Sequence, residues 1–249
     1  MESIVKLSEE NIDDEHICCA IADKKCAHGY QEKKDWLAGQ FQDGYVFKKL
    51  DVRGKVFIEY VPAEHAWVPV DAPNYLLINC FWVSGKYKGQ GYGQKLLEEC
   101  MADTQGKDGV IVVTGKTKQP FMSDKRFFKR QGFELLDEAP PYFELWGKCF
   151  SEKGARPAFK ASAKSGECSI KDGLAVYYTN ACPFTEYYVE DLVRVATARG
   201  KKITVRKLES KEEAQAHCVP YTNYTVFNDG VFVTQRILSE KEFDKVFCS

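Results

Sequence analysis

The fold of this chain is decided by one stretch, Phe81-Trp82-Val83-Ser84-Gly85-Lys86-Tyr87-Lys88-Gly89-Gln90-Gly91-Tyr92-Gly93-Gln94. It ends the apolar run 75–83 and precedes apolar residues at helical spacing, namely Leu96, Leu97, Cys100 and Met101. Glycine adopts positive φ and lets a ligand approach the main chain. The first N–H groups of a helix have no internal partner and carry partial positive charge. The stretch therefore predicts a strand, a phosphate-binding turn and a helix, with an unliganded tight turn as the alternative.

A β-α-β unit and a hairpin surround this turn. Downstream, the apolar run 109–114 closes the β-α-β unit. Upstream, residues 44–50 and 55–61 are rich in β-branched and aromatic residues, and 51–54 turns the chain between them. These patterns predict an α/β (α+β) fold class.

Shorter patterns predict the other elements before residue 150. We expect the first 40 residues to be helical, because Asn11-Ile12-Asp13-Asp14 offers an N-cap and 32–37 is a charged helical run. We expect a short helix over 125–130, which leads into the segment 132–136, and a last strand over 142–146.

A change of composition divides the chain. Between about 150 and 173, Lys, Ser, Gly and Ala dominate and Pro157 interrupts, which is typical of a linker. A second pattern of the order β-α-β-α-β-β-α follows. We expect its elements at 174–178, 185–199, 202–208, 211–217, 224–237 (a hairpin that turns through Asn228-Asp229-Gly230) and 239–247. The predicted division is a first domain over 1–150, a linker over 151–173 and a second domain over 174–249.

Composition restricts the class of protein and its partners. The 249 residues are 44% hydrophobic and 29% charged, which is typical of a globular protein with a core. The formal net charge of −1 predicts no attraction to nucleic acid or to a membrane surface. No apolar run approaches the roughly 20 residues that span a bilayer, and the N-terminus shows no signal peptide. We therefore expect a cytoplasmic protein.

Ten cysteines are scattered along the chain. Since no signal peptide is visible, we expect their thiols to be reduced. The one local cluster consists of His16, Cys18, Cys19, Cys26 and His28, and no pair in it has the Cys-x2-Cys spacing typical of zinc sites. We expect no metal site, and we expect His16, Cys19 and Cys26 to share a face of a packed helix.

Two motifs in residues 1 to about 148 resemble those of the GNAT superfamily of acetyltransferases. The family pattern has Arg or Gln, two residues, Gly, one residue and then Gly or Ala, after a strand that carries apolar-x-Val. In this chain Phe81-Trp82-Val83 ends the strand and Lys88-x-x-Gly91-x-Gly93 is the turn. Downstream, the family's later helix and its Gly-Phe turn resemble Phe127-Phe128-Lys129-Arg130-Gln131-Gly132-Phe133.

Two positions depart from the family pattern. Lys88 replaces the usual Arg or Gln, which keeps a hydrogen-bond donor but loses the planar, bidentate geometry. Phe128 stands where many members carry a tyrosine that protonates the leaving thiolate. That general acid is therefore absent or supplied from elsewhere in the chain.

The resemblance implies an acyl-CoA N-acyltransferase fold of the GNAT type and an N-acetyltransferase that uses acetyl-CoA. The acceptor would be a primary amine of a small molecule or a peptide. Pantetheine would pair with the end of the strand, and the pyrophosphate would lie on the turn. The cofactor-binding residues implied in this way are Phe81, Trp82, Val83, Lys88, Gly89, Gln90, Gly91, Tyr92, Gly93 and Gln94.

The reaction also requires a base, because an amine with a pKa near ~10 must lose a proton before it attacks. Family members commonly carry a glutamate on the strand before the turn, but Asn79 and Cys80 occupy that stretch. Glu59 and Glu64 are the available carboxylates and hence the candidate catalytic residues. An ordinary surface acid is the alternative for each, and His65 nearby is equally well a structural residue.

The second domain resembles the YoaP-like domain, which follows some acetyltransferase domains and is itself similar to thioredoxin. Cys182 stands where thioredoxins carry the first cysteine of Cys-x-x-Cys, before a helix whose N-terminus would lower the pKa of the thiol. Thr185 replaces the second cysteine, which excludes a dithiol mechanism within the motif. Val219-Pro220 falls near the position of the thioredoxin cis-proline, which would bring Cys218 close to Cys182 as a resolving thiol.

Two functions are consistent with these residues. The first is the transfer of an acetyl group from acetyl-CoA to an amine, with the second domain as a degenerate module that binds a substrate or partner. The alternative is an acyl-CoA-binding protein of thiol-redox or sensor type, in which Cys182 is the active residue.

Overall fold

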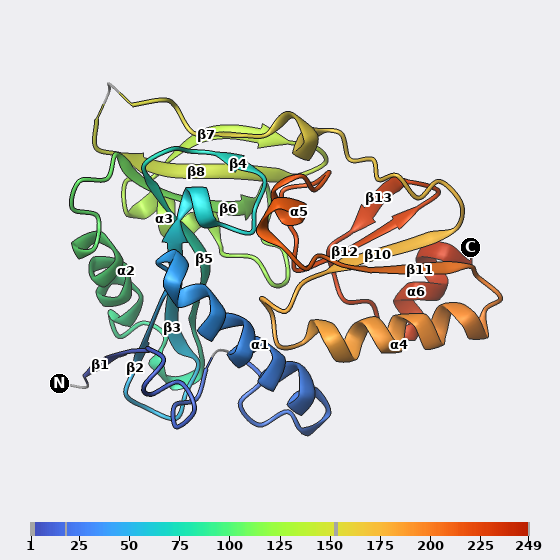
Figure 1. Ribbon diagram of the computed structural model, residues 1–249, viewed down its shortest axis with the longest axis horizontal. Helices are drawn as coiled ribbons and strands as arrows, with labels where there is room; N and C mark the ends of the chain where they lie inside the picture. The colour runs from blue at the N-terminus through green and yellow to red at the C-terminus, as the bar shows by residue number, and fades with distance from the viewer. Residues whose placement is uncertain (1–2, 18, 152–153, 249) are drawn as a thin grey trace.

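The computed structural model describes residues 3–17, 19–151 and 154–248. In Figure 1 a blue-to-green N-terminal unit lies beside an orange-to-red C-terminal unit. The N-terminal unit is built on a seven-stranded sheet and the C-terminal unit on a four-stranded sheet. A further two-stranded sheet joins the segment between the two units to the first of them.

The seven-stranded sheet has the order β1-β2-β3-β5-β6-β8-β7. Its strands are β1 (Ile4–Lys6), β2 (Val46–Leu50), β3 (Val56–Pro62), β5 (Tyr75–Val83), β6 (Gly109–Gly115), β7 (Glu134–Ala139) and β8 (Phe143–Cys149). β5 and β6 run parallel, and the other neighbouring strands run antiparallel. The predicted hairpin and β-α-β unit are confirmed.

Helices cover both faces of this sheet. α1 (Ala27–Gln40) lies on one face, and α2 (Tyr92–Ala102) and α3 (Lys125–Arg130) lie on the other. The short 3-10 helices of the unit are η1 (Lys24–Cys26), η2 (Phe41–Asp43), η3 (Ala63–His65) and η4 (Gly85–Tyr87). Within the described ranges, no helix is both long enough and apolar enough to cross a bilayer.

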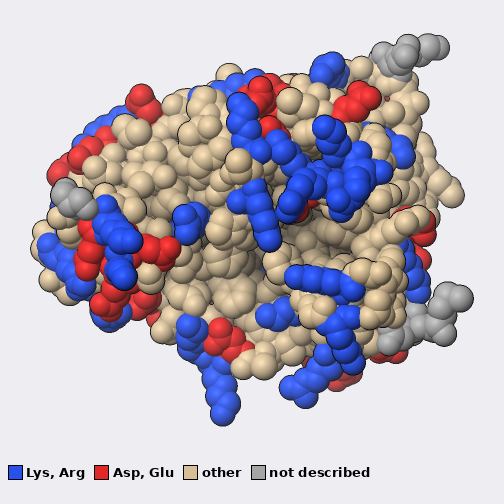
Figure 2. Space-filling view, turned by 180° about the vertical axis from the view of Figure 1, so that it is seen from behind, with Lys and Arg blue, Asp and Glu red and all other residues tan. Residues whose placement is uncertain are grey.

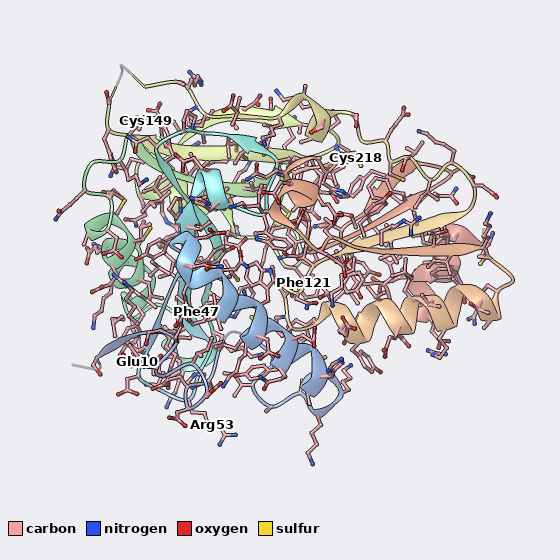
Figure 3. All side chains as sticks on the ribbon, in the orientation of Figure 1. Glu10, Phe47, Arg53, Phe121, Cys149 and Cys218 are labelled. Carbon is pink, nitrogen blue, oxygen red and sulfur yellow. The ribbon has the colours of Figure 1, made fainter. Side chains whose placement is uncertain are left out.

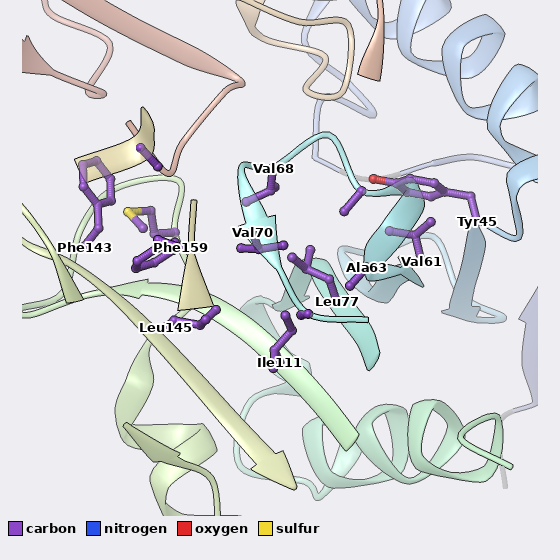
Figure 4. Close-up of a cluster of buried hydrophobic side chains, with 14 of the residues drawn as sticks. Tyr45, Val61, Ala63, Val68, Val70, Leu77, Ile111, Phe143, Leu145 and Phe159 are labelled. Carbon is purple, nitrogen blue, oxygen red and sulfur yellow. The ribbon is translucent and has the colours of Figure 1, made fainter. Parts of the chain in front are cut away.

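The alternation of β3 shows how the two faces are filled. Successive strand residues point to opposite faces, so Phe57 packs in one cluster with Leu37 of α1, whereas Ile58 packs in another with Leu96 of α2. Figure 4 shows part of the first cluster, which continues across the sheet as far as Phe159. Burial on both faces explains why the central strands read as apolar runs.

The expectation of a helical N-terminus is confirmed for α1 but wrong for the residues before it. Residues 4–6 form β1, and residues 7–17 and 19–23 form turns and irregular chain. β1 gains main-chain partners on β2 and is the edge strand of the sheet, and the side chains of Leu7, Ile12 and Ile17 are buried. These long-range contacts override the local helical preference.

The C-terminal unit has the predicted element order. Its elements are β10 (Leu174–Tyr178), α4 (Thr185–Ala198), β11 (Ile203–Lys207), α5 (Lys211–Gln215), β12 (Tyr224–Asn228), β13 (Val231–Thr234) and α6 (Glu240–Phe247). The sheet has the order β11-β10-β12-β13, and its first two strands are parallel. The likeness to thioredoxin stays a prediction.

The segment between the units is packed despite its linker-like composition. β9 (Ala158–Phe159) pairs with β4 (Val70–Asp71), and η5 (Ala161–Lys164) follows it. Phe159 and Ala163 are buried in the core. The domain boundaries at 150 and 173 stay a prediction.

One hydrophobic core spans both units. The cluster that holds Leu37 and Val68 also holds Val219 and Phe227 of the C-terminal unit. Separating the units would therefore expose apolar surface on each of them, at roughly 25 cal/mol for each Å².

Close polar contacts fix the two units against each other. The Thr222 hydroxyl donates to the Trp67 carbonyl oxygen at 2.6 Å, and the Asn180 amide donates to the Glu32 carboxylate at 2.7 Å. A Cβ added at Gly29 of α1 would lie 2.5 Å from the Pro183 carbonyl oxygen. Glycine at this position is therefore required for the close approach of α1 to the loop before α4.

Candidate functional site

β5 and β6 part at the centre of the sheet. Their pairing ends at Ile78 and Val112, although β5 runs on to Val83 and β6 to Gly115. On its other side β5 stays paired with β3 from Leu76 to Val83, apart from a bulge at Asn79. The main-chain groups of 79–83 that face β6 are thus left without a partner strand, and they can pair with an extended ligand.

The glycine turn lies directly beyond this gap. Gly89 has φ +76° and Gly91 has φ +81°, and Gly91 is the N-cap of α2. A Cβ added at either glycine would meet no atom within 4 Å, so these positions face open space and glycine is needed for the backbone conformation. The implied cofactor residues 81–83 and 88–94 therefore form a continuous strip from the free strand edge to the start of the helix.

Basic residues flank this strip. Figure 2 shows Lys and Arg side chains gathered on two sides of a hollow, on the face opposite to that of Figure 1. The turn with α2 and the segment from the end of β6 through α3 both carry such residues, which are Lys86, Lys88, Lys95, Lys116, Lys118, Lys125, Arg126, Lys129 and Arg130. A positive field of this kind favours the phosphates of a nucleotide.

A cavity of about 360 Å³ lies where the two units meet. β3 and β5 line it from the N-terminal unit, and the loops 181–184 and 220–223 line it from the C-terminal unit. The loop 120–123 forms a further wall, and Figure 3 shows Phe121 of this loop between the two units. Phe121 has φ +62°, a strained conformation for a bulky residue, and its carbonyl oxygen accepts from the Tyr221 hydroxyl at 3.2 Å.

Glu59 lies at the wall of this cavity and is 1% exposed. Its Oε1 accepts from Lys33 Nζ at 2.6 Å and from the Asn79 amide at 2.9 Å. Lys33 also lies over the ring of Trp36, with its Nζ 4.3 Å from the ring centroid. Lys33 and the Asn79 amide compensate the cost of burying the Glu59 carboxylate. The predicted Glu59 is thus part of a buried charged network.

Glu64 and His65 lie elsewhere. Glu64 is exposed on η3, and its Oε1 accepts from the Asn74 main-chain N–H at 2.5 Å. His65 Nδ1 lies 3.1 Å from Lys211 Nζ and 3.6 Å from Asp43 Oδ1, at the contact between the units. Neither residue is among the described residues that line the cavity.

Cys182 lines the cavity together with Cys19 and Cys80. Burial raises the pKa of the Cys182 thiol to about 11, and a hydrogen bond from the Phe184 main chain offsets only part of this effect. The expectation that the helix N-terminus lowers this pKa is therefore wrong, because loss of hydration outweighs the helix. Cys182 precedes α4, which begins at Thr185, by three residues.

The expected cis-proline is also corrected. In the described chain the cis peptide bond joins Pro140 and Pro141, so the bond at Val219-Pro220 is trans. Burial and the neighbouring Cys168 thiol raise the pKa of Cys218 to about 12. Both effects disfavour the Cys218 thiolate, and its role as a resolving thiol for Cys182 stays a prediction.

Phe128 has no group that could transfer a proton, and the N-terminal cluster forms no metal site among the described residues. Phe128 is fully buried and packs against Phe81, Phe127 and Phe133. In the described ranges, no group of three or more His, Cys, Asp and Glu side chains is placed to hold a metal ion, and Cys18 lies outside those ranges. The shared helical face expected for the cluster is absent, since the turns of 7–17 and 19–23 replace it.

Several residues at the cavity were missed by sequence reasoning. Lys33 lies on α1, and Phe184 and Tyr221 come from the far end of the chain. The sequence held a weak signal for Lys33 alone, because apolar residues (Tyr30, Trp36 and Leu37) lie three or four positions from it within a charged helix. The other two meet β5 only because the units pack together.

Comparisons with known proteins agree with this geometry. A model of the acetyltransferase (GNAT) domain matches residues 50–135, and a YoaP-like model matches residues 203–245. A Bacillus subtilis (strain 168) protein described as an uncharacterized N-acetyltransferase, YoaP, is 45% identical over 244 residues, which are 97% of each chain. The chain therefore belongs to the GNAT acetyltransferases, whose co-substrate is acetyl-CoA. Within them it is similar to YoaP over nearly its whole length.

Solved acetyltransferases show a more distant likeness. An acetyltransferase from Thermus thermophilus is 14% identical with a TM-score of 0.45, and the match covers 60% of this chain and 100% of that chain. A GNAT family acetyltransferase from Brucella melitensis, in complex with acetyl-CoA, is 17% identical with a TM-score of 0.40. That match covers 65% of this chain and 97% of the other.

Replacing Gly91 by glutamate tests the phosphate turn. The side chain would project into the open space at the N-terminus of α2 and repel a phosphate there, so we expect Gly91→Glu to weaken acetyl-CoA binding by at least about 100-fold. Isothermal titration measures the change. Gly106→Glu is the matched control, since Gly106 also has positive φ and open space around it but lies beyond the far end of α2. Equal affinities of the two variants would contradict the assignment.

Removing Lys33 tests the buried ion pair. Lys33→Met leaves the Glu59 carboxylate buried without its cation, and we expect a loss of about 3–5 kcal/mol in the free energy of unfolding. The double variant Lys33→Met/Glu59→Gln should regain most of that loss, because no unpaired charge remains. Urea denaturation of the four proteins of this cycle measures both effects. Additive losses would show that the two side chains do not interact.

The reactivity of Cys182 tests whether its thiol is activated. A pKa of about 11 leaves about 100-fold less thiolate at pH 7 than a thiol of ordinary pKa has. We therefore expect slow alkylation at pH 7 that accelerates about tenfold per pH unit up to the pKa. Mass spectrometry can compare Cys182 with the exposed Cys248 of the same chain. Equal rates at pH 7 would contradict the raised pKa and restore the redox hypothesis.

Proposed function

We propose that this enzyme acetylates the primary amine of a small molecule held in the cavity between its two units. The observation that carries the proposal is the composition of the cavity wall: Glu59 and the free part of β5 lie on one side, and the loops 181–184 and 220–223 close the other. Its volume of about 360 Å³ lies within the usual range for small-molecule sites.

The strip of 81–83 and 88–94 would hold acetyl-CoA. Pantetheine would pair with the free edge of β5, and the pyrophosphate would accept hydrogen bonds from the main chain at the start of α2. Lys88 would add a positive charge at the turn, as a point charge rather than a bidentate donor. A main-chain N–H of β5 beside the thioester would then stabilise the negative charge that develops on its carbonyl oxygen.

Glu59 is the base in this proposal. An acceptor amine enters largely as an ammonium ion, and Glu59 takes one proton from it, directly or through a water molecule. The neutral nitrogen attacks the carbonyl carbon, a C–N bond forms and the C–S bond breaks. The CoA thiolate leaves with the electron pair and recovers a proton from the amine nitrogen or from solvent. Lys33 and Asn79 hold Oε1 of the carboxylate in place throughout.

A small acceptor fits better than a peptide. The C-terminal unit covers the cavity where a polypeptide would have to lie, and the two units share a core and hydrogen bonds across the contact. The thiol-redox alternative has weaker support, because burial raises the pKa of Cys182. In the proposal Cys182 is part of the wall that contacts the acceptor.

Release of free CoA against a panel of small amines tests the function. We expect turnover with the wild type, and a fall in kcat of at least about 100-fold for Glu59→Gln with little change in KM for acetyl-CoA. Glu64→Gln is the matched control, since Glu64 lies outside the cavity, and it should keep its activity. Thermal unfolding of Glu59→Gln, together with rescue by Glu59→Asp, separates a lost base from a lost fold.

Other results would overturn parts of the proposal. Loss of activity in Glu64→Gln rather than Glu59→Gln would move the base to η3. Turnover with peptides alone would exclude a small acceptor.

A further inference from the structure

A second, open cavity continues the acceptor cavity toward solvent. It has a volume of about 870 Å³, and both cavities are lined by Cys19, Lys55, Trp82 and Phe184. We call this outer cavity the vestibule. An acceptor that places its amine at Glu59 can therefore extend past Lys55 into the vestibule.

The vestibule is basic. Arg53, Lys55 and Lys86 line it, and Asp23 is the one acidic side chain among the described residues of its wall. Within the described chain, none of the three cations forms an ion pair; Lys86 lies over the ring of Tyr87, with its Nζ 5.2 Å from the centroid. The wall thus carries three cations and one anion, and two of the cations, Arg53 and Lys86, are exposed. An excess of positive charge of this kind favours an anionic ligand group.

The main chain that carries the cations is held in place by the fold. Arg53 lies at the tip of the β2–β3 hairpin, as Figure 3 shows, and the Lys55 carbonyl oxygen accepts from the Ser84 N–H at 3.0 Å. A Cβ added at Gly54 would lie 2.7 Å from the ring of Tyr87, so the hairpin tip packs closely on η4. The vestibule wall is thus a fixed arrangement of two chain segments.

Arg53 and Lys55 lie on the side of β5 away from the slot for the cofactor, whereas Lys86 lies on η4, which follows β5. β3, which follows Lys55, pairs with β5 on one edge, and the gap toward β6 lies on the other edge. Arg53 and Lys55 are therefore separated from the pantetheine path by the width of β5. The anion that they suit is a part of the acceptor rather than a phosphate of CoA.

We propose that the acceptor carries an anionic group, a carboxylate or a phosphate-type group, held by Arg53, Lys55 and Lys86 while its amine lies at Glu59. Glu59 lies at one end of the channel and the three cations lie at the other, and the wall between them contains Leu77, Trp82 and Phe184. An amine and an anion on the two ends of an apolar or aromatic body match this arrangement. This inference rests on the proposed function, since it names the acceptor class of the same site.

Three amines of one shape test the inference. These are para-(aminomethyl)benzoate, para-(aminomethyl)phenylphosphonate and the neutral para-methylbenzylamine, each assayed by release of CoA. We expect kcat/KM to be at least about tenfold higher for an anionic amine than for the neutral one. We also expect the difference to shrink as the ionic strength rises. The better of the two anions identifies the kind of anionic group.

Variants of the vestibule provide the second arm. Arg53→Met/Lys55→Met should lower the ratio of kcat/KM for the anionic over the neutral amine by about tenfold, and Lys86→Met should lower it less because its charge is exposed. Lys241→Met is the control, since Lys241 is an exposed lysine on α6. This variant should keep the wild-type ratio.

The outcomes separate the inference from the proposed function. Equal kcat/KM for the three amines would overturn the anionic subsite and leave the acetyltransferase proposal intact. A rise in KM for acetyl-CoA in Arg53→Met/Lys55→Met, with the ratio unchanged, would also overturn it and assign these cations to CoA. Absence of CoA release with every amine would reject the proposed small-molecule function, and the inference with it.

Discussion

The separation of β5 from β6 is the constraint on which the site depends. A strand inside a sheet normally satisfies its main-chain groups on both sides, but β5 does so beyond Ile78 on the β3 side alone. The free edge lies between buried elements, where unpaired main-chain groups are costly unless a ligand or water occupies the gap. Because the glycine turn and the start of α2 follow at once, the free edge and the helix N-terminus form one surface for a long ligand that carries amides and phosphates.

The bulge at Asn79 links the cofactor slot to the acceptor cavity. A bulge inserts one residue and re-aims the side chains around it, and here the Asn79 amide reaches Glu59 on the neighbouring strand. Lys33 completes the network from α1. Buried ion pairs contribute little net stability compared with apolar residues of the same size, so a functional role explains this pair better than stabilisation does.

The C-terminal unit is part of the site as well as part of the fold. It shares a core with the N-terminal unit and closes the acceptor cavity with two loops. The same packing changes the chemistry of Cys182, because a thiol that is buried at the contact loses its hydration. One main-chain hydrogen bond does not compensate for that loss, and the pKa rises to about 11. A position that resembles a redox cysteine in sequence is thus part of the wall of a cavity.

The sequence by itself determined most of the strands and helices and the glycine turn, because these depend on neighbouring residues. The glycines of 89–93 need their conformation locally, and the spacing of Leu96 and Leu97 already defines the buried face of α2. The order of elements after residue 173 was predicted for the same reason.

Only the tertiary structure decided which residues meet at the cavity between the two units. Lys33 meets Glu59 across 26 residues of sequence, and Thr222 meets Trp67 across 155. Contacts over such separations leave no periodic or local signature. The N-terminal turns and the raised pKa of Cys182 have the same origin. In each case burial against a distant part of the chain outweighed the local preference that the sequence shows.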